Sequence, residues 1–200
     1  MKKLYFLALI FWAALSSAQV TFNPGIRLGA NISHLSNGPT TDYWSYSDSN
    51  GYYQYGTNKF DIKSKVDFYI GFQANIRFAR FYALQPELYY SRQGAKFESQ
   101  NPAVESKTVN LSYVGAAVVN KFYFDRFNIH FGPTLEFLTD SDNIPSPTAV
   151  DMGILLGAGY DITKNIGLEA RIKKGFVHAY NDHTNVTFQA GVYYTFTLKK

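Results

Sequence analysis

The residues best suited to chemistry in this chain are charged side chains that recur at every second position of otherwise apolar segments. Glu169, Arg171 and Lys173 form the clearest run. Alternate residues of a β-strand lie on one face, so these charges should share one side of a sheet. Facing carboxylates and cations can line an ion or proton path, or can pair and fill an enclosed space. The charged residues with this placement are Arg27, Lys65, Asp67, Arg77, Glu87, Lys121, Glu136, Asp151, Glu169, Arg171 and Lys173.

Patterns for other chemistries are weak or absent in the sequence. His178 and His183 flank Asp182. A metal site needs ligands that converge at fixed geometry, and residues on a long loop do not indicate such a geometry. The chain has no G-x-S-x-G elbow, no phosphate-binding glycine loop and no cysteine. We therefore expect no catalytic site, no metal, no cofactor and no enzymatic activity. We interpret His130 as a hydrogen-bonded residue on the charged face.

A second candidate site is the segment Thr41–Gly56, which reads TDYWSYSDSNGYYQYG. Tyr with Ser and Gly is typical of adaptable binding loops, and Tyr and Trp are common in binding hot spots. Two interpretations stay open. One is a long surface loop that contacts another protein, and the other is an exposed hairpin extension whose aromatic side chains pack on one another or at lipid headgroups. The aromatic residues of the segment are Tyr43, Trp44, Tyr46, Tyr52, Tyr53 and Tyr55.

The chain starts with the features of an export signal. Two lysines precede the apolar run Leu4–Leu15, and the small residues Ser16–Ala18 predict cleavage before Gln19. The apolar run is shorter than the roughly 20 residues that a membrane-spanning helix needs. We therefore expect a signal peptide over residues 1–18 and a single domain over residues 19–200. The formal net charge is only +4, and no basic cluster predicts nucleic-acid binding.

The segment Val66–Phe78 shows the main structural pattern of the chain. Every second residue is apolar and the residues between are mostly polar or small, which predicts a strand with one apolar and one polar face. The pattern recurs, and no segment has a sustained helical period. We predict eight strands, at about Gly25–His34, Lys65–Phe78, Tyr82–Gln93, Thr108–Phe124, Phe127–Leu138, Val150–Ile162, Ile166–Phe176 and Asn185–Phe196.

The connections between these strands alternate between short and long. An even number of strands, with short turns at one end and long loops at the other, is typical of outer-membrane barrels. Together with the export signal, this predicts an all-β, eight-stranded antiparallel up-and-down transmembrane β-barrel in the outer membrane of a Gram-negative bacterium. The charged face then lines the lumen, and eight strands leave a lumen just wide enough for side chains to fill.

Several segments resemble the PorT-like outer-membrane barrel family of Bacteroidetes. They are Gly25–Ser33, Leu84–Ser91, Gln93–Lys96, Phe131–Pro133, Gly157–Tyr160 and Thr163–Arg171. The resemblance covers nearly the whole chain after the export signal and implies an eight-stranded outer-membrane barrel, but not one particular function. The family usually carries Glu and Pro where this chain has Gly115 and Ala117, so an inward carboxylate that the resemblance implies is missing.

These patterns favour a structural or interaction protein with a filled lumen. Its expected partners are outer-membrane lipid and, through Thr41–Gly56, other envelope or extracellular proteins. One alternative is a component of a protein-secretion or gliding system, the role of the protein that gives the resembled family its name. Others are a soluble periplasmic barrel that binds an apolar ligand, and an outer-membrane enzyme. A soluble barrel would turn the apolar face inward, and eight strands cannot enclose so many bulky side chains together with a ligand.

Overall fold

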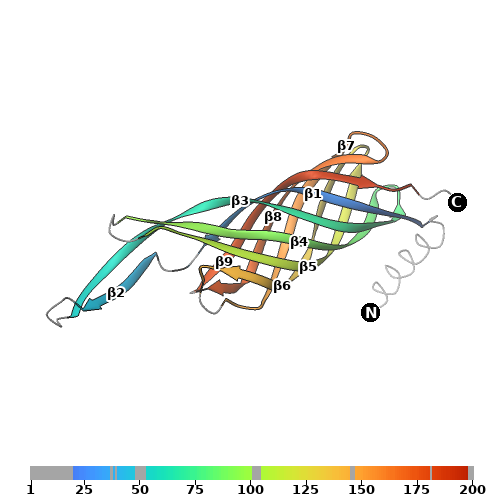
Figure 1. The fold of residues 1–200 in the computed structure, drawn as a ribbon. Coiled ribbons are helices and arrows are strands. Elements are labelled where there is room, and N and C mark those ends of the chain that lie inside the picture. Colours follow the sequence, from blue (N-terminus) through green and yellow to red (C-terminus); the bar gives the residue numbers. More distant parts are fainter. Residues whose placement is uncertain are drawn as a thin grey trace, which may run out of the picture.

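The computed structural model describes residues 20–36, 38, 40–47, 53–100, 105–144, 147–180 and 182–197. The regular elements in these ranges are strands (Figure 1). They are β1 (Thr21–Ser36), β2 (Thr41–Ser47), β3 (Tyr53–Ala79), β4 (Tyr82–Ser99), β5 (Lys107–Phe124), β6 (Phe127–Asp142), β7 (Val150–Asp161), β8 (Ile166–Tyr180) and β9 (His183–Thr195). The same ranges contain no helix with the length and apolar character needed to cross a membrane. The predicted signal peptide lies outside the described residues.

Eight of these strands close into one antiparallel barrel. β1 pairs with β9 on one side and with β3 on the other, and the strands from β3 to β9 each pair with the next in sequence. At this closure, Ala30 of β1 lies opposite both Phe68 of β3 and Ala190 of β9. The predicted fold class, an eight-stranded antiparallel up-and-down barrel, is confirmed.

β2 stands outside the barrel and corrects the interpretation of Thr41–Gly56 as a loop. Its described partner is the first part of β3, with Thr41 opposite Lys59. β3 accordingly begins at Tyr53 instead of Lys65. The segment Thr41–Gly56 therefore lies largely in an antiparallel hairpin, which was the alternative to a loop. Tyr, Trp and Thr favour extended backbone, and here that preference outweighs the Ser, Asn and Gly residues between them.

The two ends of the barrel differ in length. Short turns join β3 to β4, β5 to β6 and β7 to β8, and the start of β1 and the end of β9 lie at this end (Figure 1). At the opposite end, β2 and the start of β3 extend beyond the closed barrel (Figure 1). We call β2 together with residues 53–59 of β3 the projecting hairpin.

The outward face of the barrel is apolar. Phe72 is 70% exposed and Leu88 is 63% exposed. The residues predicted to form the outward row are all exposed, namely Phe68, Ile70, Phe72, Phe131, Leu135, Phe188 and Val192. A continuous apolar surface of this kind is costly in water and is stable in contact with hydrocarbon.

Glycines on the inward face make room for tyrosine rings from neighbouring strands. A Cβ atom on Gly191 would lie 2.4 Å from the hydroxyl oxygen of Tyr69, and one on Gly167 would lie 2.3 Å from that of Tyr193. Neither separation is possible for real atoms, so any larger residue would have to displace the ring. These two glycines therefore serve the packing of the lumen.

Candidate functional site

Four charged side chains form a cluster in the middle of the lumen, which we call the central grid. Arg27 of β1 and Arg171 of β8 face Glu87 of β4 and Glu169 of β8, and all four are at most 4% exposed. Arg27 pairs with both carboxylates, and its Nη2 lies 2.5 Å from Glu169. Arg171 lies 2.8 Å from Glu87 and 2.9 Å from Glu169. Each buried charge thus has two partners of opposite sign, which offsets its desolvation.

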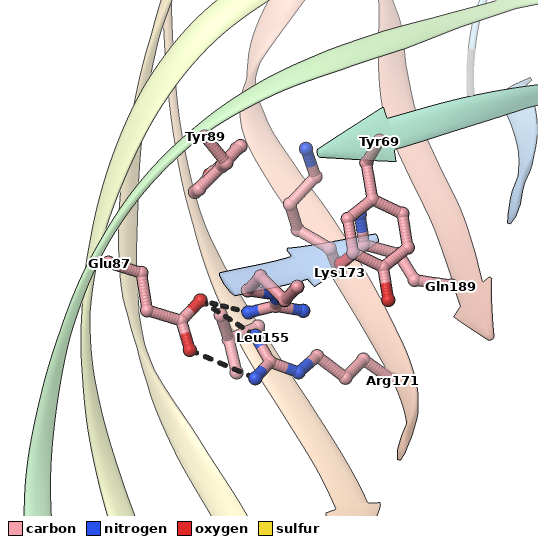
Figure 2. Close-up of a pocket in the computed structure, with 8 residues that line it drawn as sticks. Tyr69, Glu87, Tyr89, Leu155, Arg171, Lys173 and Gln189 are labelled. Carbon is pink, nitrogen blue, oxygen red and sulfur yellow. Dashed lines mark hydrogen bonds and ion pairs between the residues drawn. The ribbon is translucent and has the colours of Figure 1, made fainter. Parts of the chain in front are cut away.

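Neutral side chains complete the central grid. The Tyr69 hydroxyl donates a hydrogen bond of 2.9 Å to Glu169, and the Gln85 amide donates one of 2.7 Å to Glu87. Glu87 and Arg171 face each other (Figure 2). They line a cavity of about 10 Å³. A cavity of this size holds about one water molecule. The described side chains therefore fill the lumen at this level.

A second group of charges lies towards the end with the projecting hairpin. Lys173 pairs with Glu136, and Lys65 pairs with Asp67. Arg92, which the sequence analysis did not single out, lies 3.7 Å from Asp67 and is partly exposed. Asp151 accepts weaker hydrogen bonds, from the Asn185 amide at 3.5 Å and the Val177 backbone at 3.4 Å.

The cations at the short-turn end of the lumen lie over tyrosine rings. The Arg77 guanidinium carbon is 3.8 Å from the centroid of the Tyr123 ring, and Lys121 Nζ is 4.4 Å from that of Tyr193. Among the described residues neither cation forms an ion pair. Cation–π contacts of this kind stabilise a desolvated charge without a carboxylate.

Asp161 belongs to the same end of the lumen and was missed by the sequence analysis. It accepts a hydrogen bond from the Tyr193 hydroxyl. It sits two residues after the inward Gly159, so the alternation along the predicted strand could have found it. Among the described residues, and with Asp161 included, the lumen carries equal numbers of cations (Arg27, Lys65, Arg77, Lys121, Arg171, Lys173) and carboxylates (Asp67, Glu87, Glu136, Asp151, Asp161, Glu169).

An apolar layer closes the lumen above the charges, at the end with the projecting hairpin. Its buried members are Leu35, Ala95, Val109, Leu111, Tyr113 and Ala179. Ile62 and Phe97 pack against them from the extensions of β3 and β4. Leu35, Ala95 and Ala179 lie beyond the ends of the predicted strands, so the sequence did not place them in this layer. Val109, Leu111 and Tyr113 lie within the predicted strand Thr108–Phe124, but alternation alone does not show which residues of other strands they meet. A groove of about 410 Å³ lies beside it, between the end of β1 and residues 59–62 of β3.

Gly115 stands where the resembled PorT-like family usually carries Glu, and the structure shows what occupies the space of that side chain. A Cβ atom there would lie 2.7 Å from the Tyr89 ring and 2.9 Å from Glu136. The space that a side chain on β5 would need is therefore occupied by Tyr89 and by a carboxylate from the neighbouring strand β6. A carboxylate is present in this region of the lumen, but it comes from a different strand.

The histidines lie in different environments. His178 and Asp182 are exposed and 3.4 Å apart, whereas His183 is 1% exposed and packs edge-on against Phe97. His130 is buried, and its Nδ1 lies 3.0 Å from the Asn128 side chain. In the described part of the chain, no three His, Cys, Asp or Glu side chains are grouped as metal ligands.

Strand pairing of the backbone shows where five of the six aromatic residues predicted to form a contact loop lie. Tyr43, Trp44 and Tyr46 belong to β2, and Tyr53 and Tyr55 belong to the paired start of β3. Within the described ranges β2 pairs only with β3, so the backbone groups along its other edge have no strand partner. The sixth aromatic residue, at position 52, lies outside the described residues.

The distribution of apolar and charged residues between the two faces of the barrel argues against a soluble barrel that binds an apolar ligand. That alternative needs apolar residues inside and charges outside. The structure has Arg27 and Glu169 buried inside and Phe72 and Phe188 exposed outside. The lumen therefore has no apolar chamber at the level of the central grid.

Comparison with known proteins gives one family and several similar folds. The profile of the family described as "Outer membrane protein beta-barrel domain" matches residues 17–181. The crystal structure of Neisserial surface protein A has a TM-score of 0.54 at 17% identity, over 86% of this chain and 97% of that one. OprG from Pseudomonas aeruginosa has a TM-score of 0.49 at 12% identity, over 90% of this chain and 99% of that one. At these identities the similarity concerns the fold alone. No curated protein matches the chain.

Proposed function

We propose that this chain, which belongs to the outer membrane protein β-barrel domain family, is a structural or interaction protein that contacts other envelope or extracellular proteins through its projecting hairpin. The observation that carries the proposal is the contrast between a filled lumen and a paired extension beyond the barrel. A filled lumen offers no route for solute, whereas Tyr, Trp and Ser residues on an extension are suited to protein contact.

The membrane orientation follows from the rule that short turns of such barrels face the periplasm. We infer that an export signal is cleaved after Ala18 and that the mature domain begins at Gln19. The projecting hairpin then lies outside the cell. Protease treatment of intact cells should release peptides from residues 41–58 and leave the Ala79–Tyr82 turn intact. Release of the turn with protection of the hairpin would show the inverse orientation.

The contact role is tested by site-specific photo-crosslinking in intact cells. A photoreactive residue at position 44 of β2 should give discrete protein adducts. The same residue at position 72, which faces lipid, is the matched control and should give none. Adducts at neither position, or equal adducts at both, would contradict a contact surface on the hairpin.

The filled lumen is tested by planar-bilayer recording of the pure protein. We expect no stable porin-like channels, because paired side chains occupy the middle of the lumen. Stable, large channels from the wild-type protein would refute this part of the proposal.

A second candidate function is a component of a protein-secretion or gliding system. The segments Leu84–Ser91 and Gln93–Lys96 favour it through their resemblance to the PorT-like family of Bacteroidetes. Deletion of the gene should then abolish secretion or gliding, and the wild-type gene should restore it. In both candidates the protein has no enzymatic activity, no metal and no cofactor.

A further inference from the structure

The three short turns share one arrangement of side chains. Each turn carries one exposed cation next to exposed apolar residues. Arg80 precedes Phe81, which is 63% exposed, and Arg126 precedes Phe127, which is 42% exposed. Lys164 lies between Ile162 and Ile166, which are 46% and 42% exposed. We call Arg80, Arg126 and Lys164 the basic rim.

Backbone hydrogen bonds fix these turns next to one another. The Tyr123 N–H donates to the Phe81 carbonyl at 2.8 Å, which ties the first turn to the second. The Asp161 N–H donates to the Arg126 carbonyl at 2.8 Å, which ties the second turn to the third. The basic rim is therefore a continuous arc from β3 to β8 on a rigid part of the barrel.

The arc keeps a net positive charge, because its three cations outnumber the exposed carboxylate in the same turns. The described ion pairs do not involve any of its three cations. Asp125 is an exposed carboxylate in these turns, whereas Asp161 is engaged with Tyr193. At the opposite end, by contrast, Lys63 lies 2.5 Å from Glu98. A cation at the end with the projecting hairpin thus forms an ion pair, whereas the described ion pairs include none at the basic rim.

We propose that the basic rim binds the headgroups of anionic phospholipids in the leaflet that surrounds the short turns. The rim continues an apolar surface that already contacts lipid, so its cations lie where lipid phosphates lie. Exposed aromatic residues accompany it, as is typical of the level where hydrocarbon meets water. These are Phe22, Phe81, Phe124, Phe127, Tyr160, Tyr194 and Phe196. Arginine and lysine stems extend along apolar surface while the charge reaches the headgroup.

The flanking residues favour lipid over an acidic protein as the occupant. An acidic protein in the periplasm would need cations that point into water. Here Arg80 and Arg126 each adjoin an exposed phenylalanine, and Lys164 lies two residues from an exposed isoleucine on either side. These cations therefore stay at the membrane surface. Each basic residue near an anionic lipid surface contributes to binding, and salt screens this attraction.

The experiment measures lipid selectivity with spin-labelled phospholipids in phosphatidylcholine bilayers that contain the full mature barrel. Labelled phosphatidylglycerol should associate with the wild-type protein about threefold more strongly than labelled phosphatidylcholine at low salt. The preference should disappear in about 1 M sodium chloride, where the Debye length is about 3 Å. The triple variant R80Q/R126Q/K164Q should lower the ratio towards one. Heat-modifiable gel migration checks that each variant is folded.

The matched control removes the same charge from the other end of the barrel, in the variant K59Q/K63Q/K96Q. This variant should keep the wild-type ratio. An equal fall in both triple variants would show that net charge, and not the rim, attracts the lipid. A wild-type ratio of one would also overturn the proposal, and it would point to an acidic protein as the partner of these cations. If the triple rim variant does not fold, the three single variants should each lower the ratio in part.

Discussion

Strand β3 passes through two regions that differ in what holds them together. Residues 65–79 lie in the barrel, where β1 and β4 pair with them and where one face meets lipid and the other meets the packed lumen. Residues 53–59 lie in the projecting hairpin, where β2 pairs with them. Between them, residues 60–64 pair with β4, and the β3–β4 register shifts between Ser64 and Tyr69, at the start of the barrel part. Barrel stability and surface contact should therefore be separable along this one strand.

The largest effect should come from removing one member of the central grid. Arg171→Met should destabilise the barrel by about 3–5 kcal/mol, because Glu87 and Glu169 would then share a single cation. The double variant R171M/E87M leaves Arg27 paired with Glu169 and should cost less than the single variant. The measurement is denaturant unfolding in lipid vesicles, read by gel migration. A double variant that is less stable than the single one would contradict the pairing.

A charge on the lipid-facing side of the barrel part of β3 should have the next largest effect. Phe72→Arg should cost about 2–4 kcal/mol if the residue lies near the middle of the bilayer. Asp61→Arg is the control in the extension of the same strand, and it should change stability by less than about 0.5 kcal/mol because Asp61 is exposed to water. Equal losses at both positions would mean that the extension also contacts hydrocarbon.

Removal of the projecting hairpin should have little effect on the barrel. Replacement of residues 41–58 by Asn-Gly joins Thr40 to Lys59 through a turn suited to antiparallel strands. The barrel ladders stay complete, so the unfolding free energy should change by less than about 1 kcal/mol. A loss as large as that of the central-grid variant would show that the hairpin supports the barrel.

The smallest expected effect concerns one ion pair on the extension. A hydrogen bond and charge attraction from Glu98 raise the pKa of Lys63 above its ordinary value. Glu98→Gln should therefore lower the pKa of Lys63 in an NMR titration, whereas Glu105→Gln should leave it unchanged. Because the folded-state pKa is raised, the pair stabilises the folded protein at neutral pH, and this contribution is lost as the pH rises through the pKa of Lys63. An unchanged pKa in E98Q would mean that the pair does not persist in solution.

The alternation of residue types predicted the faces of the strands, and together with the alternating loop lengths and the export signal it predicted the barrel. In Val66–Phe78 the apolar and polar positions are separated almost without exception, so one register satisfies both lipid and lumen. The ends of the strands were harder to predict. Phe60 and Ile62 still alternate with the exposed Asp61 and Lys63, but residues 53–59 show no sustained apolar alternation. The hairpin was therefore interpreted from its composition, which indicated a loop.

The pairing of charges inside the barrel could not be predicted from the sequence. Alternation placed Arg27 and Glu87 on the inward face, but they are 60 residues apart in sequence and meet only through the closure of the sheet. Which cation meets which carboxylate depends on the stagger between strands, and one sequence does not reveal that stagger. Alternation alone would have placed Asp161 on the inward face. It was overlooked because it lies at the end of its strand.

The central grid also constrains the order in which the barrel can assemble. Arg27 comes from the first strand of the chain, and its partner Glu169 comes from the second-last strand. A chain that inserted strand by strand would carry isolated charges into hydrocarbon until nearly all of it had arrived. Insertion should therefore be concerted, with the first and last strands brought together before the charges leave water. A chain truncated before β8 would lack both Arg171 and Glu169, leaving Arg27 and Glu87 without half of their partners.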